Sequence, residues 1–116
     1  MDPLQLFHNL VNLAAADQKF AEEEIQFLVA HAERHNIPNE EFLTAIHGIE
    51  QGAVEIVLPE SHEDRVTLLT EMIKLMAVDG EVAEMEKRIC AQASAKMDFT
   101  STQFSELLDK VLSGEG

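Results

Sequence analysis

The sequence repeats itself at an offset of 62 positions, and this duplication constrains the fold more than any other feature. At that offset the segment LAAADQKFAEEEIQFL, which starts at Leu13, falls on LMAVDGEVAEMEKRIC, which starts at Leu75. The alignment runs without a gap from about Leu4 to Ile49, and at many unmatched positions one apolar residue replaces another. We therefore predict that all 116 residues form a single domain. Its parts are repeat one (about 4–50), a linker (about 53–60) and repeat two (about 61–113).

Each copy carries three stripes of apolar residues at helical spacing, which predicts a three-helix unit. In the first copy the stripes are Leu6, Phe7, Leu10, Val11, Leu13 and Ala14, then Ile25, Leu28, Val29 and Ala32, then Phe42, Ala45, Ile46 and Ile49. In the second copy they are Leu68, Leu69, Met72, Ile73 and Met76, then Val82, Met85, Ile89 and Ala93, then Phe104, Leu107, Leu108 and Val111. One unit cannot hide three apolar faces alone. We therefore predict an all-α fold of about six helices, in which the two copies pack about a pseudo-two-fold and share one core.

Local signals mark several helix ends. Ser61 followed by Asp64, and Thr100 followed by Gln103, resemble capping boxes that open the first and third helices of the second copy. Pro59 prevents the linker from continuing into the next helix. The apolar residues of the linker indicate that it lies against the body of the domain.

The chain is strongly acidic, with 22 acidic and 8 basic side chains and a formal charge of −14. Such a surface repels phosphate backbones and anionic headgroups, and no apolar run approaches the roughly 20 residues that span a bilayer. The single cysteine, Cys90, excludes an internal disulfide and fits a reducing cytoplasm. We expect a cytoplasmic protein that binds protein partners or small cations, binds no nucleic acid and is not inserted in a membrane.

Acidic residues recur between the first and second helices of both copies. The segments are DQKFAEEE, which starts at Asp17, and DGEVAEME, which starts at Asp79. Glu84 and Glu86 are two residues apart, so on a helix they point about 200° apart and cannot both converge with Asp79. Glu86 and its counterpart Glu24 lie over apolar helix positions. The candidate cation ligands are therefore Asp17, Glu24, Asp79 and Glu86.

Two interpretations of these four carboxylates stay open. In the first they stabilise helix N-termini, where each negative charge contributes about 0.3–1 kcal/mol and side-chain oxygens accept hydrogen bonds from exposed amides. In the second they bind a hard divalent cation, Ca²⁺, Mg²⁺ or Mn²⁺, for which carboxylate oxygens are preferred ligands. The spacing is not that of an EF-hand, because the ligands before its glycine and its final glutamate are absent.

The segment LMAVDGEVAEME, from Leu75, and its echo LAAADQKFAEEE, from Leu13, resemble the tellurite-resistance TerB-like family, which includes the N-terminal domain of DjlA-type co-chaperones. In that family a helix ends in Ala-x-Asp-Gly, and a glutamate follows seven places after the aspartate. The resemblance covers nearly the whole chain. It implies an all-helical, internally duplicated fold and a metal-associated acidic site at Asp17, Glu24, Asp79 and Glu86.

These features predict a non-enzymatic acidic module of TerB-like type that binds a divalent cation or a protein partner in a bacterial stress response. Two alternatives are a metal-dependent hydrolase that uses the same carboxylates and a structural interaction domain with no ligand site. His31 and His35, four residues apart, have a spacing that can hold Zn²⁺ or Ni²⁺. No cysteine or third histidine accompanies them, so a solvated helix flank is the better interpretation.

Overall fold

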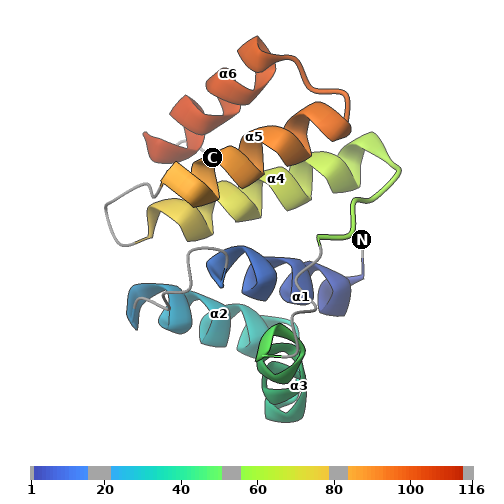
Figure 1. The fold of residues 1–116 in the computed structure, drawn as a ribbon, viewed down its shortest axis with the longest axis vertical. Coiled ribbons are helices and arrows are strands. Elements are labelled where there is room, and N and C mark those ends of the chain that lie inside the picture. The colour runs from blue at the N-terminus through green and yellow to red at the C-terminus, as the bar shows by residue number, and fades with distance from the viewer. Residues whose placement is uncertain (1, 16–21, 51–55, 79–83, 114–116) are drawn as a thin grey trace.

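The computed structural model describes residues 2–15, 22–50, 56–78 and 84–113, and within these ranges the chain forms six α-helices and no β-strand. The helices are α1 (Pro3–Ala14), α2 (Glu22–Arg34), α3 (Asn39–Glu50), α4 (His62–Ala77), α5 (Glu84–Lys96) and α6 (Ser101–Leu112) (Figure 1). The predicted all-α fold with six helices is confirmed. Asp17, Asp79 and Val82 lie outside the described residues.

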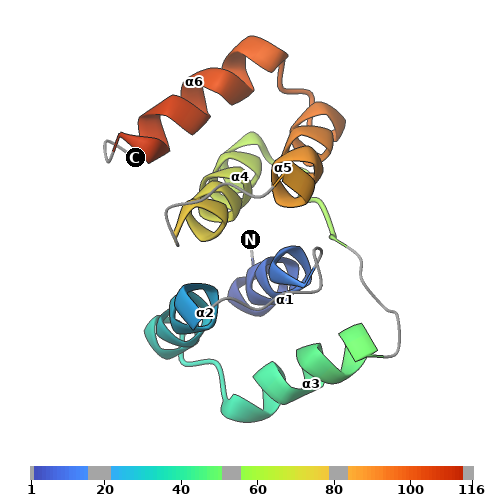
Figure 2. The same ribbon diagram turned by 60° about the vertical axis from the view of Figure 1, so that its left-hand side comes forward.

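The helix bounds reproduce the sequence repeat. Helices α2 and α5 begin and end at positions 62 apart, and so do α3 and α6. Helix α4 has 16 residues and α1 has 12, and most of the difference is an extra turn at the start of α4. In Figure 2, α2 and α5 are both seen nearly along their axes, whereas α3 and α6 lie across the page on opposite outer sides. The second and third helices therefore have matching bounds in the two copies.

The turn after the second helix is also the same in both copies. Asn36 and Asp98, which are 62 positions apart, have left-handed backbones with φ angles of 55° and 68°. After Asn36, the N–H of Ile37 donates to the carbonyl oxygen of Ala32 at an N–O distance of 2.8 Å, and the residue after Asp98 makes the equivalent bond at 3.0 Å. This is the Schellman arrangement, which satisfies carbonyl groups that the helix end leaves without partners. A short polar side chain tolerates the left-handed backbone better than a branched one.

Helix α1 of the first copy lies against α4 of the second copy, and these two helices supply most of the core (Figure 2). Helix α1 also contacts α5, and α4 contacts α2. Two like units packed face to face produce this reciprocal pattern. The largest fully buried side chains are Phe7, Leu10, Val11, Leu13, Leu28, His31, Leu68, Leu69, Met72, Ile73, Leu75 and Met76. The pseudo-two-fold itself stays a prediction.

The linker is fixed against both copies by hydrogen bonds to its backbone. Asn9 is fully buried, and its Nδ2 donates to the carbonyl oxygen of Val57 at 2.8 Å. The N–H of Val57 donates in return to Asn9 Oδ1 at 2.9 Å. Arg65 donates from Nε to the carbonyl oxygen of Pro59 at 2.9 Å and from Nη1 to that of Met97 at 3.3 Å. The predicted position of the linker against the body is confirmed for its described part.

The predicted caps of α4 and α6 are confirmed. Ser61 Oγ accepts a hydrogen bond from the N–H of Asp64 at 3.2 Å. At α6 the capping box is complete, because Thr100 Oγ1 accepts from the N–H of Gln103 at 3.1 Å and Gln103 Oε1 accepts from the N–H of Thr100 at 2.8 Å. Each N-cap satisfies amides that lack partners within the helix and contributes about 1 kcal/mol.

Candidate functional site

The structure describes the side chain of one of the four predicted cation ligands. Glu24 lies in the first turn of α2 and is 4% exposed, whereas its neighbours Glu22 and Glu23 are exposed. The prediction that Glu24 faces the apolar side of its helix is therefore confirmed. Burial of an ionised carboxylate costs free energy unless hydrogen bonds or a cation compensate for it. Both interpretations of the acidic segments supply such compensation.

The other three predicted ligands stay untested. Glu86 lies in the first turn of α5, at the position equivalent to Glu24, but its side chain is outside the described part of the structure, as are Asp17 and Asp79. Within the described ranges, no three His, Cys, Asp or Glu side chains come together in a group that could hold a metal ion. The convergence of the four carboxylates on one cation stays a prediction.

The interpretation of the histidine pair as a solvated flank is wrong for His31. Its side chain is 1% exposed, and its ring stacks on Phe7 with a centroid distance of 6.2 Å and an interplanar angle of 12°. The ring of His35, which is exposed as predicted, lies 4.4 Å away between centroids. Burial, with smaller contributions from the neighbouring His35 and Arg34, lowers the pKa of His31 to about 4, so His31 is neutral at pH 7.

The packing of His31 explains the error. His31 follows Leu28 and Glu24 on the inward face of α2, so it joins the stripe that contacts α1. Neither Nδ1 nor Nε2 of His31 has a hydrogen-bond partner among the residues that the structure describes. His31 therefore acts here as an aromatic core residue.

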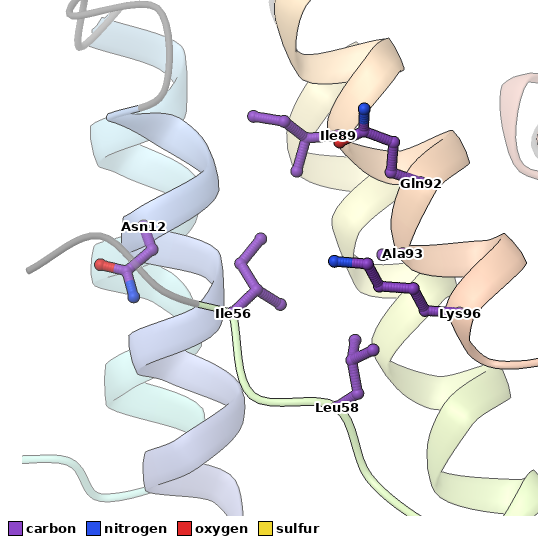
Figure 3. Close-up of a pocket in the computed structure, with 7 residues that line it drawn as sticks. All are labelled: Asn12, Ile56, Leu58, Ile89, Gln92, Ala93 and Lys96. Atoms are coloured by element: carbon purple, nitrogen blue, oxygen red, sulfur yellow. The ribbon is translucent and has the colours of Figure 1, made fainter.

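A pocket of about 350 Å³ opens between α1, the linker and α5 (Figure 3). Its lining residues are Asn12, Ile56, Leu58, Ile89, Gln92, Ala93 and Lys96. In Figure 3 the ammonium group of Lys96 extends over the space between the linker and α5. One cation beside a small apolar surface is weak recognition for an anion in a chain with a formal charge of −14. These lining residues also include no hydroxyl, thiol, carboxylate or imidazole.

A second hollow, an apolar groove of about 280 Å³, runs between α2 and α3. Ile25 and Val29 of α2 line one side, Phe42 and Leu43 of α3 line the other, and Ile37 comes from the turn between them. Three of these side chains are large, apolar and exposed: Ile25 by 37%, Val29 by 44% and Leu43 by 68%. We call this surface, defined by Ile25, Val29, Phe42 and Leu43, the α2–α3 groove.

The prediction that Ile25 and Val29 belong to the core is wrong, and the helix arrangement gives the reason. Helix α2 buries Leu28 and Ala32 against α1 and α4, while α3 packs against α1. In Figure 2, α3 extends away from α2, and no described helix lies over the outer side of α2. Ile25 and Val29 therefore remain on the surface.

The second copy does not reproduce this surface. The positions equivalent to Ile25, Val29 and Leu43 are Lys87, Ala91 and Ser105. Lys87 and Ser105 are exposed, and Ala91 is half-buried against the core. Helix α5 also packs directly against α6, whereas the main neighbours of α2 are α1 and α4. The α2–α3 groove is therefore a property of the first copy and does not follow from the fold alone.

The surroundings of the groove are acidic. Glu33 is the charged residue in its lining, and Glu22 and Glu40 lie one helical turn before Ile25 and Leu43. All three carboxylates belong to exposed residues. The groove therefore combines an apolar floor with a negatively charged edge.

Comparison of the chain with protein-family models, with curated proteins and with solved structures found no match. None of the helices in the described ranges combines the length and the apolar character needed to traverse a bilayer. The function of this chain is therefore inferred from its own surfaces.

Proposed function

We propose that this chain is a non-enzymatic helical module that binds a protein partner through the α2–α3 groove. The observation that carries the proposal is the exposure of Ile25, Val29 and Leu43 in one copy, where the other copy has Lys87, Ala91 and Ser105. Covering apolar surface gains about 25 cal/mol per Å². Contiguous exposed apolar side chains with polar residues around them are typical of protein interaction sites.

A binding role is also better supported than catalysis. Among the described residues that line the α2–α3 groove, Glu33 is the one carboxylate, and there is no imidazole or thiol. General acid–base or nucleophilic chemistry needs at least two such groups within hydrogen-bond reach. The groove therefore provides contact area and shape, which are what recognition of a partner requires.

The TerB-like resemblance supplies the biological setting of this proposal. A duplicated three-helix unit is what that family implies, and the matching bounds of α2 with α5 and of α3 with α6 support it. On that resemblance we assign the module to the bacterial cytoplasm and to a stress response.

Cation binding by the acidic segments is a second candidate, which one observation favours. Glu24 is buried in the first turn of α2, although the exposed positions beside it were available for a carboxylate. A buried carboxylate is a strong ligand for a divalent cation when further oxygen atoms converge on it. Asp17, Asp79 and Glu86 are the proposed source of those oxygen atoms.

The test of the protein-binding proposal exchanges the surfaces of the two copies. Short peptides displayed on phage are selected against the folded protein and measured by fluorescence anisotropy. The variant Ile25→Lys/Val29→Ala/Leu43→Ser, which carries the residues of the second copy, should bind the selected peptides at least about tenfold more weakly, because all three changes remove apolar contact area. Its thermal unfolding should change little, because the three positions are exposed.

The reciprocal variant is the matched control. Lys87→Ile/Ala91→Val/Ser105→Leu adds the same three apolar residues to α5 and α6, and it should leave the affinity of the original groove unchanged. Peptides that bind the first variant as tightly as the wild type would refute the proposal.

A further inference from the structure

We infer that the partner segment is an amphipathic helix with basic residues on both sides of its apolar face. This inference rests on the proposed function of the α2–α3 groove, and it specifies the chemistry of the occupant. Three features of the groove carry it: its helical walls, its length along α2 and the charge of its edge.

The walls of the groove favour a helix over an extended segment. Beyond their first turns, helices α2 and α3 use their backbone N–H and C=O groups in their own hydrogen bonds, and neither wall presents the row of alternating donors and acceptors of a strand edge. An extended peptide in the groove would lose hydrogen bonds to water without gaining a ladder of backbone partners. A helix brings its backbone already satisfied and buries only its apolar side chains.

The length of the groove fits about two turns of such a helix. Along α2 the lining runs from Ile25 through Val29 to Glu33, which is about 12 Å at 1.5 Å per residue. Ile25 and Val29 are one turn apart and face the same side of α2. A partner helix with apolar residues at i, i+3 or i+4, and i+7 would place them along this row and against Phe42.

The charge of the groove edge selects a basic partner. Glu22, Glu33 and Glu40 are exposed on the two helices that form the groove, and Glu33 belongs to its lining. The whole chain has a formal charge of −14, so an acidic partner meets repulsion during approach and at the contact. A second copy of this chain meets the same repulsion, with −14 on each side. Lysine or arginine residues beside the apolar face of a partner helix would instead pair with the three carboxylates.

The experiment compares two synthetic helical peptides that share the same apolar residues at i, i+3, i+4 and i+7. One peptide has lysines beside this row and the other has glutamates. By fluorescence anisotropy at low salt, the lysine peptide should bind at least about tenfold more tightly than the glutamate peptide, because three exposed ion pairs together amount to about that factor. The difference should shrink at about 1 M salt, where the screening length is about 3 Å.

A charge-matched pair of variants locates the effect. Glu22→Gln/Glu33→Gln/Glu40→Gln removes three charges at the groove and should weaken the lysine peptide about tenfold. The control, Glu60→Gln/Glu106→Gln/Asp109→Asn, removes three exposed charges elsewhere and should weaken it less than about twofold.

The outcomes separate this inference from the proposed function. The two peptides could bind the wild type equally and both bind Ile25→Lys/Val29→Ala/Leu43→Ser more weakly. That result would refute the inference of a basic partner but would still support the groove as a docking site. Equal weakening by the two charge variants would also overturn the inference, because the attraction would then come from net charge alone. If the phage-selected peptides of the surface-exchange test bind that apolar variant as tightly as the wild type, the proposed function itself fails.

Discussion

The buried amide of Asn9 allows a quantitative prediction about what fixes the linker to α1. Asn9→Ala removes both hydrogen bonds between α1 and the backbone of Val57, at 2.8 and 2.9 Å, and leaves the linker sequence itself unchanged. Each bond contributes about 1 kcal/mol net, and loss of a buried polar partner adds a desolvation penalty. Val57 as a residue is 47% exposed and its two hydrogen bonds to Asn9 are partly buried, so we expect only part of this penalty.

We therefore expect Asn9→Ala to lower the free energy of unfolding by about 2–3 kcal/mol. For a domain of this size that corresponds to a Tm about 8–12 °C lower. The measurement is urea and thermal unfolding followed by circular dichroism, together with hydrogen exchange at the amide of Val57, which should lose its protection locally.

Val57→Ala is the control, because it trims the partly exposed side chain and keeps both backbone hydrogen bonds. It should lower the free energy of unfolding by less than about 1 kcal/mol. If Asn9→Ala were no more destabilising than Val57→Ala, the amide would not hold the linker, and the account of the linker given by these two hydrogen bonds would be wrong.

The remaining predictions concern His31 and the acidic segments. The pKa of His31 is lowered from 6.5 to about 4, so its contribution to stability is complete above pH 6.5 and is lost as the pH falls toward 4. Between pH 7 and pH 5 the wild type should lose about 2 kcal/mol of unfolding free energy that His31→Leu does not lose, and equal acid sensitivity of the two proteins in urea unfolding would contradict this. For the acidic segments, chelator-treated protein should melt several degrees higher in millimolar Ca²⁺, Mg²⁺ or Mn²⁺, because saturation at 100 times the Kd adds about 2.7 kcal/mol. Asp79→Asn should abolish that rise, whereas a lower Tm of Asp79→Asn in chelator alone supports helix capping instead.

The repeat allowed more of the fold to be predicted from sequence than the individual helices did. Residues 62 apart can adopt the same backbone conformation, as the left-handed Asn36 and Asp98 show. The caps at Ser61 and Thr100 were also readable, because hydroxyl and carboxyl or amide groups three residues apart satisfy the amides of a helix start. Such signals depend on short stretches of chain, so they survive without knowledge of tertiary contacts.

The surface of α2 could not be predicted in this way. An apolar stripe shows that a residue can be buried, but burial of Ile25 and Val29 depends on where α3 lies after the Asn36 turn. Comparison of the copies held a usable signal, since Ile25 aligns with Lys87 and Leu43 with Ser105. A core position rarely exchanges a large apolar residue for lysine or serine, so these two pairs indicated exposure.

The bond between Asn9 and Val57 was beyond sequence reasoning for a different reason. The two residues are 48 positions apart, and the sequence around an asparagine in an apolar stripe does not indicate which residue will hydrogen-bond to it. His31 was misassigned for a similar reason, because an imidazole that is neutral can pack like an aromatic ring.

Because α1 and α4 bury their apolar faces against each other, residues of both halves of the duplication form the hydrophobic core. A change in volume at Leu10 on one side is felt by the opposite half, so the two halves are obliged to evolve together at their mutual contact. The outward-facing residues of the second and third helices of each half can differ in sequence without affecting this shared core. The contrast between Ile25, Val29 and Leu43 and their polar or small counterparts shows where this duplicated protein had room to specialise.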